Sequence, residues 1–248
     1  MPLLVAATLG GGLLGLPVVG LLLKVPWSSL GGDLGDGDVL DALRLSLVCA
    51  TSATVLGLLV GVPLAWVLAH APPRARRLLR VLVTVPLVLP PVVGGIALLM
   101  TFGRRGLLGT SLPFSTAGVV LAEAFVAMPF LVLSVEAGLR SQDGRLHEAA
   151  ATLGLGPWQR FLHIDLPGAS NGILAGACLC WARALGEFGA TITFAGSLRG
   201  TTRTLPLATY LALETDLDKA LVLSVVLLAV CAAVLVLLRD NWLPQVRS

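Results

Sequence analysis

Charged and aromatic residues are scarce in this sequence. Only 12% of the 248 residues are charged and 5% are aromatic, whereas 56% are hydrophobic. Soluble domains carry roughly 25% charged and about 45–50% apolar residues, so a soluble core could not hide this much apolar surface. We therefore predict an integral membrane protein that forms a single transmembrane domain over residues 1–248.

Cysteine is also rare, with four residues at Cys49, Cys178, Cys180 and Cys231. All four lie inside apolar runs, where a thiol usually packs as a small hydrophobic group. The pair Cys178 and Cys180 has no second ligand pair nearby, so we predict neither a metal site nor disulfide bonds. The net charge of +3 is too small for this length to indicate a nucleic-acid partner.

Signatures of catalysis are missing as well. The phosphate-binding loop G-x-x-x-x-G-K-[S/T] does not occur, so the chain is not expected to hydrolyse ATP by that mechanism. The histidines His70, His147 and His163 lie at the ends of apolar runs or in a loop, and no nucleophile, base and orienting group recur together. We predict that the chain is no enzyme, with no catalytic residue and no cofactor of its own.

What the sequence does contain is a series of apolar runs. A helix needs about 20 residues to cross a membrane, and helices satisfy their own backbone hydrogen bonds in lipid. Six runs fit this length: Leu3–Leu23, Leu45–His70, Val81–Phe102, Ala117–Leu139, about Ala169–Phe194 and Ala220–Leu238. The first has no basic segment before it, so we interpret it as a span and not as a signal peptide. The fold class predicted is all-α with six transmembrane helices.

Basic residues near the ends of spans indicate orientation. The densest cluster, PPRARRLLR, lies between the second and third spans and is expected on the cytoplasmic side. Arg140, Arg145, Arg160, Arg239 and Arg247 then fall on the same side, and the acidic segment GGDLGDGDVLD falls outside. This arrangement predicts that both termini are cytoplasmic.

The segment between the fourth and fifth spans, EAAATLGLGPWQRFLHIDLPGAS, is polar and punctuated by glycine and proline. Asp143 is expected to cap a short helix that Gly154 ends, Pro157 to start a second, and Pro167 to open the next span. Two short amphipathic helices with a tight bend are predicted. Their apolar faces fit two partners equally well: the bundle or membrane interface of the chain itself, or a second, soluble protein.

This segment resembles the EAA loop of ABC importer permeases. The resemblance rests on Glu148, Ala149, Ala150, Gly154, Ile164, Leu166 and Pro167. It implies the type I ABC importer permease fold, in which residues 140–167 form cytoplasmic coupling helices that sit in a groove of a separate ATPase. That ATPase would bind the ATP and magnesium. In such a loop, small alanines allow close approach, Gly154 permits the turn, and Pro167 passes motion on to the fifth span.

A second segment, WARALGEFGATITFAGSLRGTTRTLPLATYLAL, is similar to the molybdate permease branch of that family. The portions ATITF and TRTLPL carry the distinction, because sulfate permeases share the preceding ARALGEFG in related form. The resemblance implies a homodimer with two ATPases and an extracytoplasmic molybdate-binding protein, in the plasma (inner) membrane of a bacterium or archaeon. Two features depart from it: Glu123 has no assigned role, and GSLRGTTRT lacks an expected acidic residue.

Polar residues inside the fifth span suggest a path for the anion. Arg183 and Glu187, four residues apart, share a helix face and form either a structural ion pair or a positive site beside an oxyanion pathway. Thr191 and Thr193 either donate to a tetrahedral dianion or bond to the helix backbone.

Two alternatives to molybdate import remain. Tungstate or sulfate are oxyanions of the same tetrahedral class. An ion-coupled anion carrier without an ATPase would need protonatable groups in the path, for which Glu123, Glu136 and Glu187 are the candidates, but it would leave the punctuated loop without a purpose.

Overall fold

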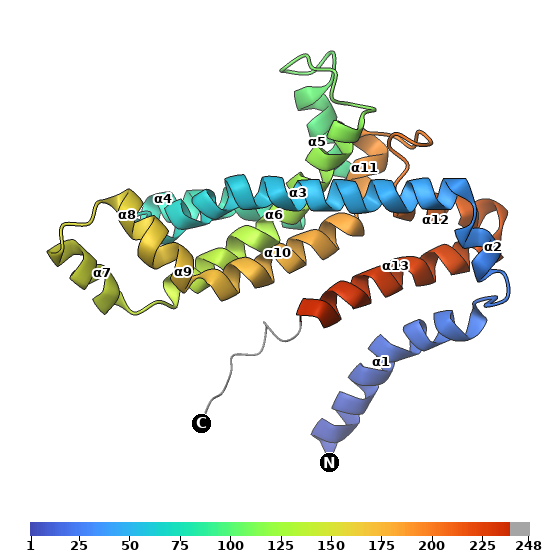
Figure 1. The fold of residues 1–248 in the computed structure, drawn as a ribbon, viewed down its shortest axis with the longest axis horizontal. Coiled ribbons are helices and arrows are strands. Elements are labelled where there is room, and N and C mark those ends of the chain that lie inside the picture. Colours follow the sequence, from blue (N-terminus) through green and yellow to red (C-terminus); the bar gives the residue numbers. More distant parts are fainter. Residues whose placement is uncertain (239–248) are drawn as a thin grey trace.

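The chain folds entirely into helices in the part that the computed structural model describes, residues 1–238 (Figure 1). The elements are α1 (Pro2–Lys24), α2 (Leu30–Leu34), α3 (Gly37–His70), α4 (Pro73–Val88), α5 (Pro91–Phe102), α6 (Thr116–Arg140), α7 (Gly144–Thr152), α8 (Pro157–Arg160), the π-helical segment η1 (Phe161–Asp165), α9 (Leu166–Gly168), α10 (Ser170–Leu185), α11 (Gly189–Phe194), α12 (Leu205–Thr215) and α13 (Leu217–Leu238). The all-α prediction is confirmed over this range. Arg239 and Arg247, which entered the orientation argument, lie outside the described residues.

Helices α3, α6 and α10 form the centre of the molecule and lie side by side in Figure 1. Their buried side chains, among them Leu68, Leu131 and Leu185, make the main apolar cluster. Glycines let the backbones approach: a Cβ added at Gly172 of α10 would lie 2.9 Å from the Ser134 carbonyl oxygen of α6. Close contact through small residues is the usual way in which helices associate in a membrane.

Within residues 1–238, four helices are long and apolar enough to cross a membrane on their own: α1, α3, α6 and α13. The predicted third span, Val81–Phe102, is not one straight helix. The pair α4 and α5 is bent by 115° at Leu89 and Pro90, because consecutive prolines lack the N–H donors of a helix and disfavour helical geometry in the preceding residue. This bent pair is counted as a fifth span if it crosses as a unit.

The predicted fifth span, Ala169–Phe194, is also interrupted. It consists of α10, 16 residues long, and the short α11, separated by Gly186–Phe188. Helix α12 lies between the predicted fifth and sixth spans, where no helix was expected. The number of six spans therefore stays a prediction.

Different short helices lie at the two ends of the bundle. Helices α4, α7, α8 and α9 gather at one end of the molecule, together with the end of α3, whereas α2 and α12 lie at the other (Figure 1). Helix α1 lies apart from the centre and contacts α13 at its C-terminal end, where Leu21 and the following Val25 pack against Val222 and Val225. Its apolar surface is otherwise exposed along its length.

Candidate functional site

The loop between α6 and α10, residues 141–169, contains the two short helices expected from the sequence. The Asp143 carboxylate accepts a hydrogen bond from the Arg145 N–H at 3.0 Å at the start of α7. Gly154 has a φ of +73°, a left-handed conformation that strains residues with a side chain. Pro157 stands in the first turn of α8. We call this segment the α6–α10 loop.

The residues of the EAA resemblance divide into two groups in space. Glu148 and Gly154 are exposed on or just after α7, whereas Ala150 of the same helix is 2% exposed and so is covered by this chain itself. Ala149 lies in α7, and its side chain is outside the described set. The second group lies on the return to the bundle: Ile164 in η1, and Leu166 and Pro167 in α9, with Leu166 packed against the main apolar cluster.

Asp165 fastens the α6–α10 loop to the bundle. Its side chain is buried and accepts a hydrogen bond from the Trp66 indole N–H of α3 at 2.6 Å. Its backbone carbonyl accepts a second from the Gln142 amide, just after α6, at 2.9 Å. Phe161 packs edge-on against Trp66 with ring centroids 5.8 Å apart and stacks on Trp158 at 5.4 Å. The return segment is thus joined to α3 and α6 as well as to α10.

Sequence reasoning missed Asp165. A signal was available, because an acidic residue stands among apolar ones in HIDLP at the point where the chain re-enters the bundle. Such a residue is buried only with hydrogen-bond partners. Its partner Trp66 is 99 residues away, so no local pattern identifies the pair.

Arg183 and Glu187 form an ion pair at the break between α10 and α11. The Arg183 Nη1 atom lies 2.6 Å from Glu187 Oε2, and the Glu187 side chain is 1% exposed. The other carboxylate oxygen, Oε1, accepts the Ala190 N–H at 2.8 Å. Glu187 therefore satisfies a backbone donor at the start of α11 and the guanidinium at the end of α10. The structural ion pair, one of the two expectations for these residues, is present.

The two threonines of α11 have different surroundings. The Thr193 hydroxyl donates to the Gly189 carbonyl oxygen at 2.8 Å, the backbone bond considered from the sequence. Thr191 is fully buried, and its hydroxyl has no hydrogen-bond partner among the described residues. Of the two threonines, Thr191 is therefore the one whose hydroxyl could donate to an anion without breaking a hydrogen bond to the described residues.

Glu123 of α6 is another buried carboxyl, 1% exposed. Its Oε2 atom has no hydrogen-bond partner in the described part of the chain. Glu136, by contrast, is paired with Arg80 of α4 and with Arg140, whose Nη1 lies 3.5 Å away. Of the three carboxylates that an ion-coupled carrier would use, Glu136 and Glu187 are thus held by arginines.

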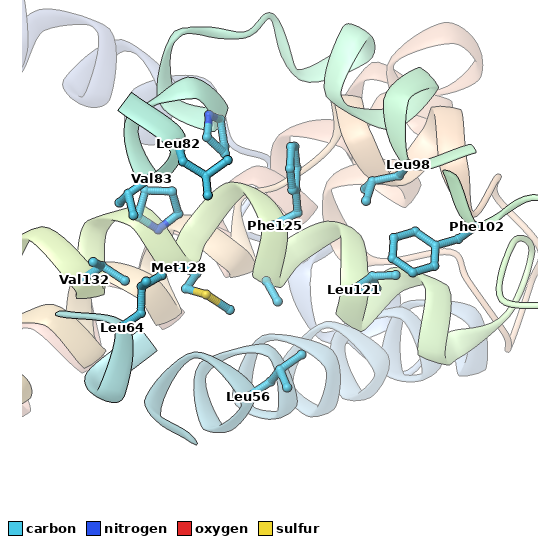
Figure 2. Close-up of a pocket in the computed structure, with 13 residues that line it drawn as sticks. Leu56, Leu64, Leu82, Val83, Leu98, Phe102, Leu121, Phe125, Met128 and Val132 are labelled. Atoms are coloured by element: carbon cyan, nitrogen blue, oxygen red, sulfur yellow. The ribbon is translucent and has the colours of Figure 1, made fainter. Parts of the chain in front are cut away.

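A cavity of about 340 Å³ lies among α3, α4, α5 and α6 (Figure 2). Figure 2 shows Leu82, Phe125 and Met128 directed into it, and none of the 13 residues that line it is charged. An anion would lose its hydration there without gaining polar contacts. This cavity is therefore no oxyanion site in the conformation described.

The comparisons with known proteins agree on one family. The family described as "Binding-protein-dependent transport system inner membrane component" matches residues 53–247. The chain is 47% identical over 226 residues to the molybdenum transport system permease protein ModB of Mycobacterium tuberculosis, covering 88% of this chain and 86% of that protein. It is 38% identical over 213 residues to the protein of the same name from Escherichia coli K12, covering 83% and 93%.

Solved structures show the same fold at low sequence identity. A bacterial alginate ABC transporter, in complex with its alginate-bound periplasmic protein, matches with a TM-score of 0.74 and 15% identity, covering 96% of this chain and 93% of that chain. The MetNI methionine ABC transporter in inward-facing form matches with a TM-score of 0.68 and 18% identity, covering 82% and 95%. The family description names a transport system that depends on a binding protein. The chain belongs to the family of binding-protein-dependent transport system inner membrane components, and it is a multi-pass permease of the inner membrane.

Proposed function

We propose that this chain is the transmembrane subunit of an ATP-driven importer that carries molybdate into the cytoplasm by alternating access. The observation that carries the proposal is the 47% identity to a molybdenum transport permease over 88% of the chain. The α6–α10 loop supports it, because an ATP-driven permease needs an exposed segment that its ATPase can contact, and a carrier without an ATPase leaves this segment unexplained.

The working assembly contains two copies of this chain, two cytoplasmic ATPases and an extracytoplasmic molybdate-binding protein. The absence of a phosphate-binding loop from the sequence is consistent with ATP and magnesium bound by the ATPases alone. The exposed apolar residues of α1, among them Leu3, Leu9 and Leu13, suit contact with membrane lipid and with the second copy.

Both termini and the α6–α10 loop lie in the cytoplasm in this proposal. The arginines at the start of α4 support this orientation. Arg76 donates to the carbonyl oxygens of Ala69 and Ala71 at the end of α3. These arginines therefore lie at the same end of the molecule as α8 (Figure 1). An excess of basic residues on one side is typical of the cytoplasmic face.

ATP-driven closure of the ATPases would draw together residues 140–167 of the two copies, which are the last residue of α6 and most of the α6–α10 loop. Helix α7, which carries Glu148, Ala149 and Ala150, and Gly154 after it form the part that engages the ATPase, with the buried Ala150 packing α7 against this chain. Ile164, Leu166 and Pro167 pass the displacement to α10, while the hydrogen bonds of Asp165 to Trp66 and Gln142 pass it to α3 and α6. Rigid elements joined in this way turn a small displacement into a change between two packed arrangements.

The path of the anion follows the break between α10 and α11. The guanidinium of Arg183 provides positive potential, and the Thr191 hydroxyl is a donor without a partner in the described residues. Glu187 keeps Arg183 in place, and Thr193 contributes through the geometry of α11. Weak contacts of this kind suit a transporter, since a tight site would hold the anion and slow its release.

The test is uptake of radiolabelled molybdate into proteoliposomes that contain the chain and its ATPase, with the binding protein added outside. Gly154→Ala is the diagnostic variant, because a side chain in the left-handed region costs about 1–2 kcal/mol and distorts the turn after α7. Gly156→Ala is the matched control, because Gly156 has an ordinary backbone conformation, with a φ of −68°, and its nearest neighbouring atom lies 3.9 Å from the added Cβ. We expect Gly154→Ala to lower uptake and stimulated ATPase activity at least several-fold, and Gly156→Ala to leave both unchanged.

Two further arms separate the alternatives. Competition by tungstate and sulfate tests the anion, and a clear preference for sulfate would overturn molybdate as the substrate. Uptake that continues without ATP but follows a proton gradient would instead support the ion-coupled carrier.

A further inference from the structure

A basic groove of about 520 Å³ lies between α4 and the end of α6, outside the α6–α10 loop and the proposed anion path. Its lining consists of Pro73, Arg76, Arg77, Arg80, Val81, Thr84 and Arg140. The first turns of α4 thus present three arginines to one hollow, and α6 adds a fourth. No acidic residue belongs to the lining.

The arginines of this groove are held in place to different degrees. Arg80 and Arg140 both contact the buried Glu136, yet each keeps nearly half of its side chain exposed. Arg76 donates through one terminal nitrogen to the end of α3, and its Nε atom has no partner in the described residues. Arg77 is exposed. One carboxylate therefore opposes four guanidinium groups, which leaves a preorganised site for an anion.

The same face of α4 becomes apolar beyond the groove. Val81 and Thr84 line the groove, and Val85 and Val88 follow them at a spacing of four residues, so they lie on the same helix face. All three valines are exposed, Val88 to 83%. A charged hollow that continues into an exposed apolar strip matches a molecule with an anionic head and hydrocarbon chains.

We propose that this groove binds the phosphate head group of an anionic phospholipid, with the acyl chains along Val81, Val85 and Val88. A free phosphate or another small oxyanion would use the arginines but not the apolar strip. The helix α4 begins at Pro73, so the positive end of its dipole points to the same place. The bound lipid would fix the α4–α6 contact at the end of the bundle that carries the α6–α10 loop.

The probe is dioleoyl-phosphatidylglycerol, compared with dioleoyl-phosphatidylcholine of the same chains. Native mass spectrometry of the purified full-length chain counts the lipids bound over a concentration series. Arg77→Gln removes one charge from the groove without removing a hydrogen bond within the described chain. Arg74→Gln is the matched control, because Arg74 is an exposed arginine on the same helix that does not line the groove.

We expect phosphatidylglycerol to bind more tightly than phosphatidylcholine. Arg77→Gln should lower the affinity for phosphatidylglycerol about fivefold, the ratio that corresponds to about 1 kcal/mol per basic residue at a membrane surface. Arg77→Lys should restore most of the affinity, and Arg74→Gln should leave it unchanged. Equal thermal midpoints would show that the variants are folded. Equal losses of phosphatidylglycerol affinity in Arg74→Gln and Arg77→Gln would overturn the proposal, because they would indicate diffuse surface charge. Displacement of the lipid by millimolar inorganic phosphate or molybdate would also overturn it, because the groove would then bind a free oxyanion.

Discussion

The contact between α5 and α11 depends on one glycine, and its replacement is a direct test of the structure. A Cβ added at Gly95 would lie 2.7 Å from Thr193 Cβ, 2.9 Å from the Ala190 carbonyl oxygen and 3.1 Å from Ala190 Cα. Two of these are backbone atoms that no rotamer change can move, so α5 and α11 must separate. Overpacking of this kind costs about 1–3 kcal/mol. At about 2–4 °C per kcal/mol for a chain of this size, we expect Gly95→Ala to lower the melting temperature by roughly 2–12 °C.

The neighbouring Gly94 provides the control. A Cβ there would contact only the Phe125 side chain, at 3.2 Å, and a ring can shift by the few tenths of an ångström required. Alanine also favours a helix over glycine by about 1 kcal/mol. Melting can be followed with a dye that reacts with the buried Cys49 and Cys180 as they become accessible. Equal melting temperatures for Gly94→Ala and Gly95→Ala would contradict the close contact of Gly95 with α11.

Two further predictions concern polar groups. Arg183→Gln leaves the buried Glu187 carboxylate without its arginine partner and should destabilise the protein by about 3–5 kcal/mol. The double variant with Glu187→Gln should recover part of that loss, as measured in a thermal double-mutant cycle. Additive effects of the two substitutions would contradict the ion pair. Trp66→Phe keeps an aromatic ring beside Phe161 but removes the hydrogen bond to Asp165, and should cost about 1–3 kcal/mol. Because this bond joins the α6–α10 loop to α3, the variant should also lower ATP-driven uptake, and an unchanged rate would exclude it from coupling.

The sequence predicted the elements that depend on local chemistry. The scarcity of charge and the length of the apolar runs were sufficient to predict a helical membrane protein, because lipid offers the backbone no other hydrogen-bond partners. The cap at Asp143, the end of a helix at Gly154 and the start of another at Pro157 were also predictable, since each follows from the geometry of a single residue. The backbone of the α6–α10 loop agrees with those expectations.

The interruptions of the spans were not predicted, although their causes are visible in the sequence. The run VLPP at residues 88–91 stops α4, but average hydropathy over 20 residues does not register it. The break before α11 depends on Glu187, whose carboxylate bonds to the Ala190 N–H. Hydropathy detects how long a run is, and it is insensitive to where the backbone bends inside it.

The bend between α4 and α5 and the break between α10 and α11 lie against each other, and this contact helps to stabilise both inside an apolar bundle. Helix α5, after the bend, packs on α11, after the break, and Gly95 contacts Ala190 and Thr193 there. Irregular backbone at membrane depth is stable only where protein covers it and satisfies its polar groups. The contact brings the two turns together, since a Cβ added at Gly189 would lie 2.7 Å from Pro91 Cβ. Glu187 accepts a hydrogen bond from the Ala190 N–H, which the break would otherwise leave without a partner. A straight fifth span would have carried Arg183 and Thr191 as one rigid unit. The break instead places Arg183 on α10, which follows the α6–α10 loop, and Thr191 on α11, which packs on α5. In the proposed mechanism, a displacement of the loop would move α10 and so change the distance between the two groups that contact the anion.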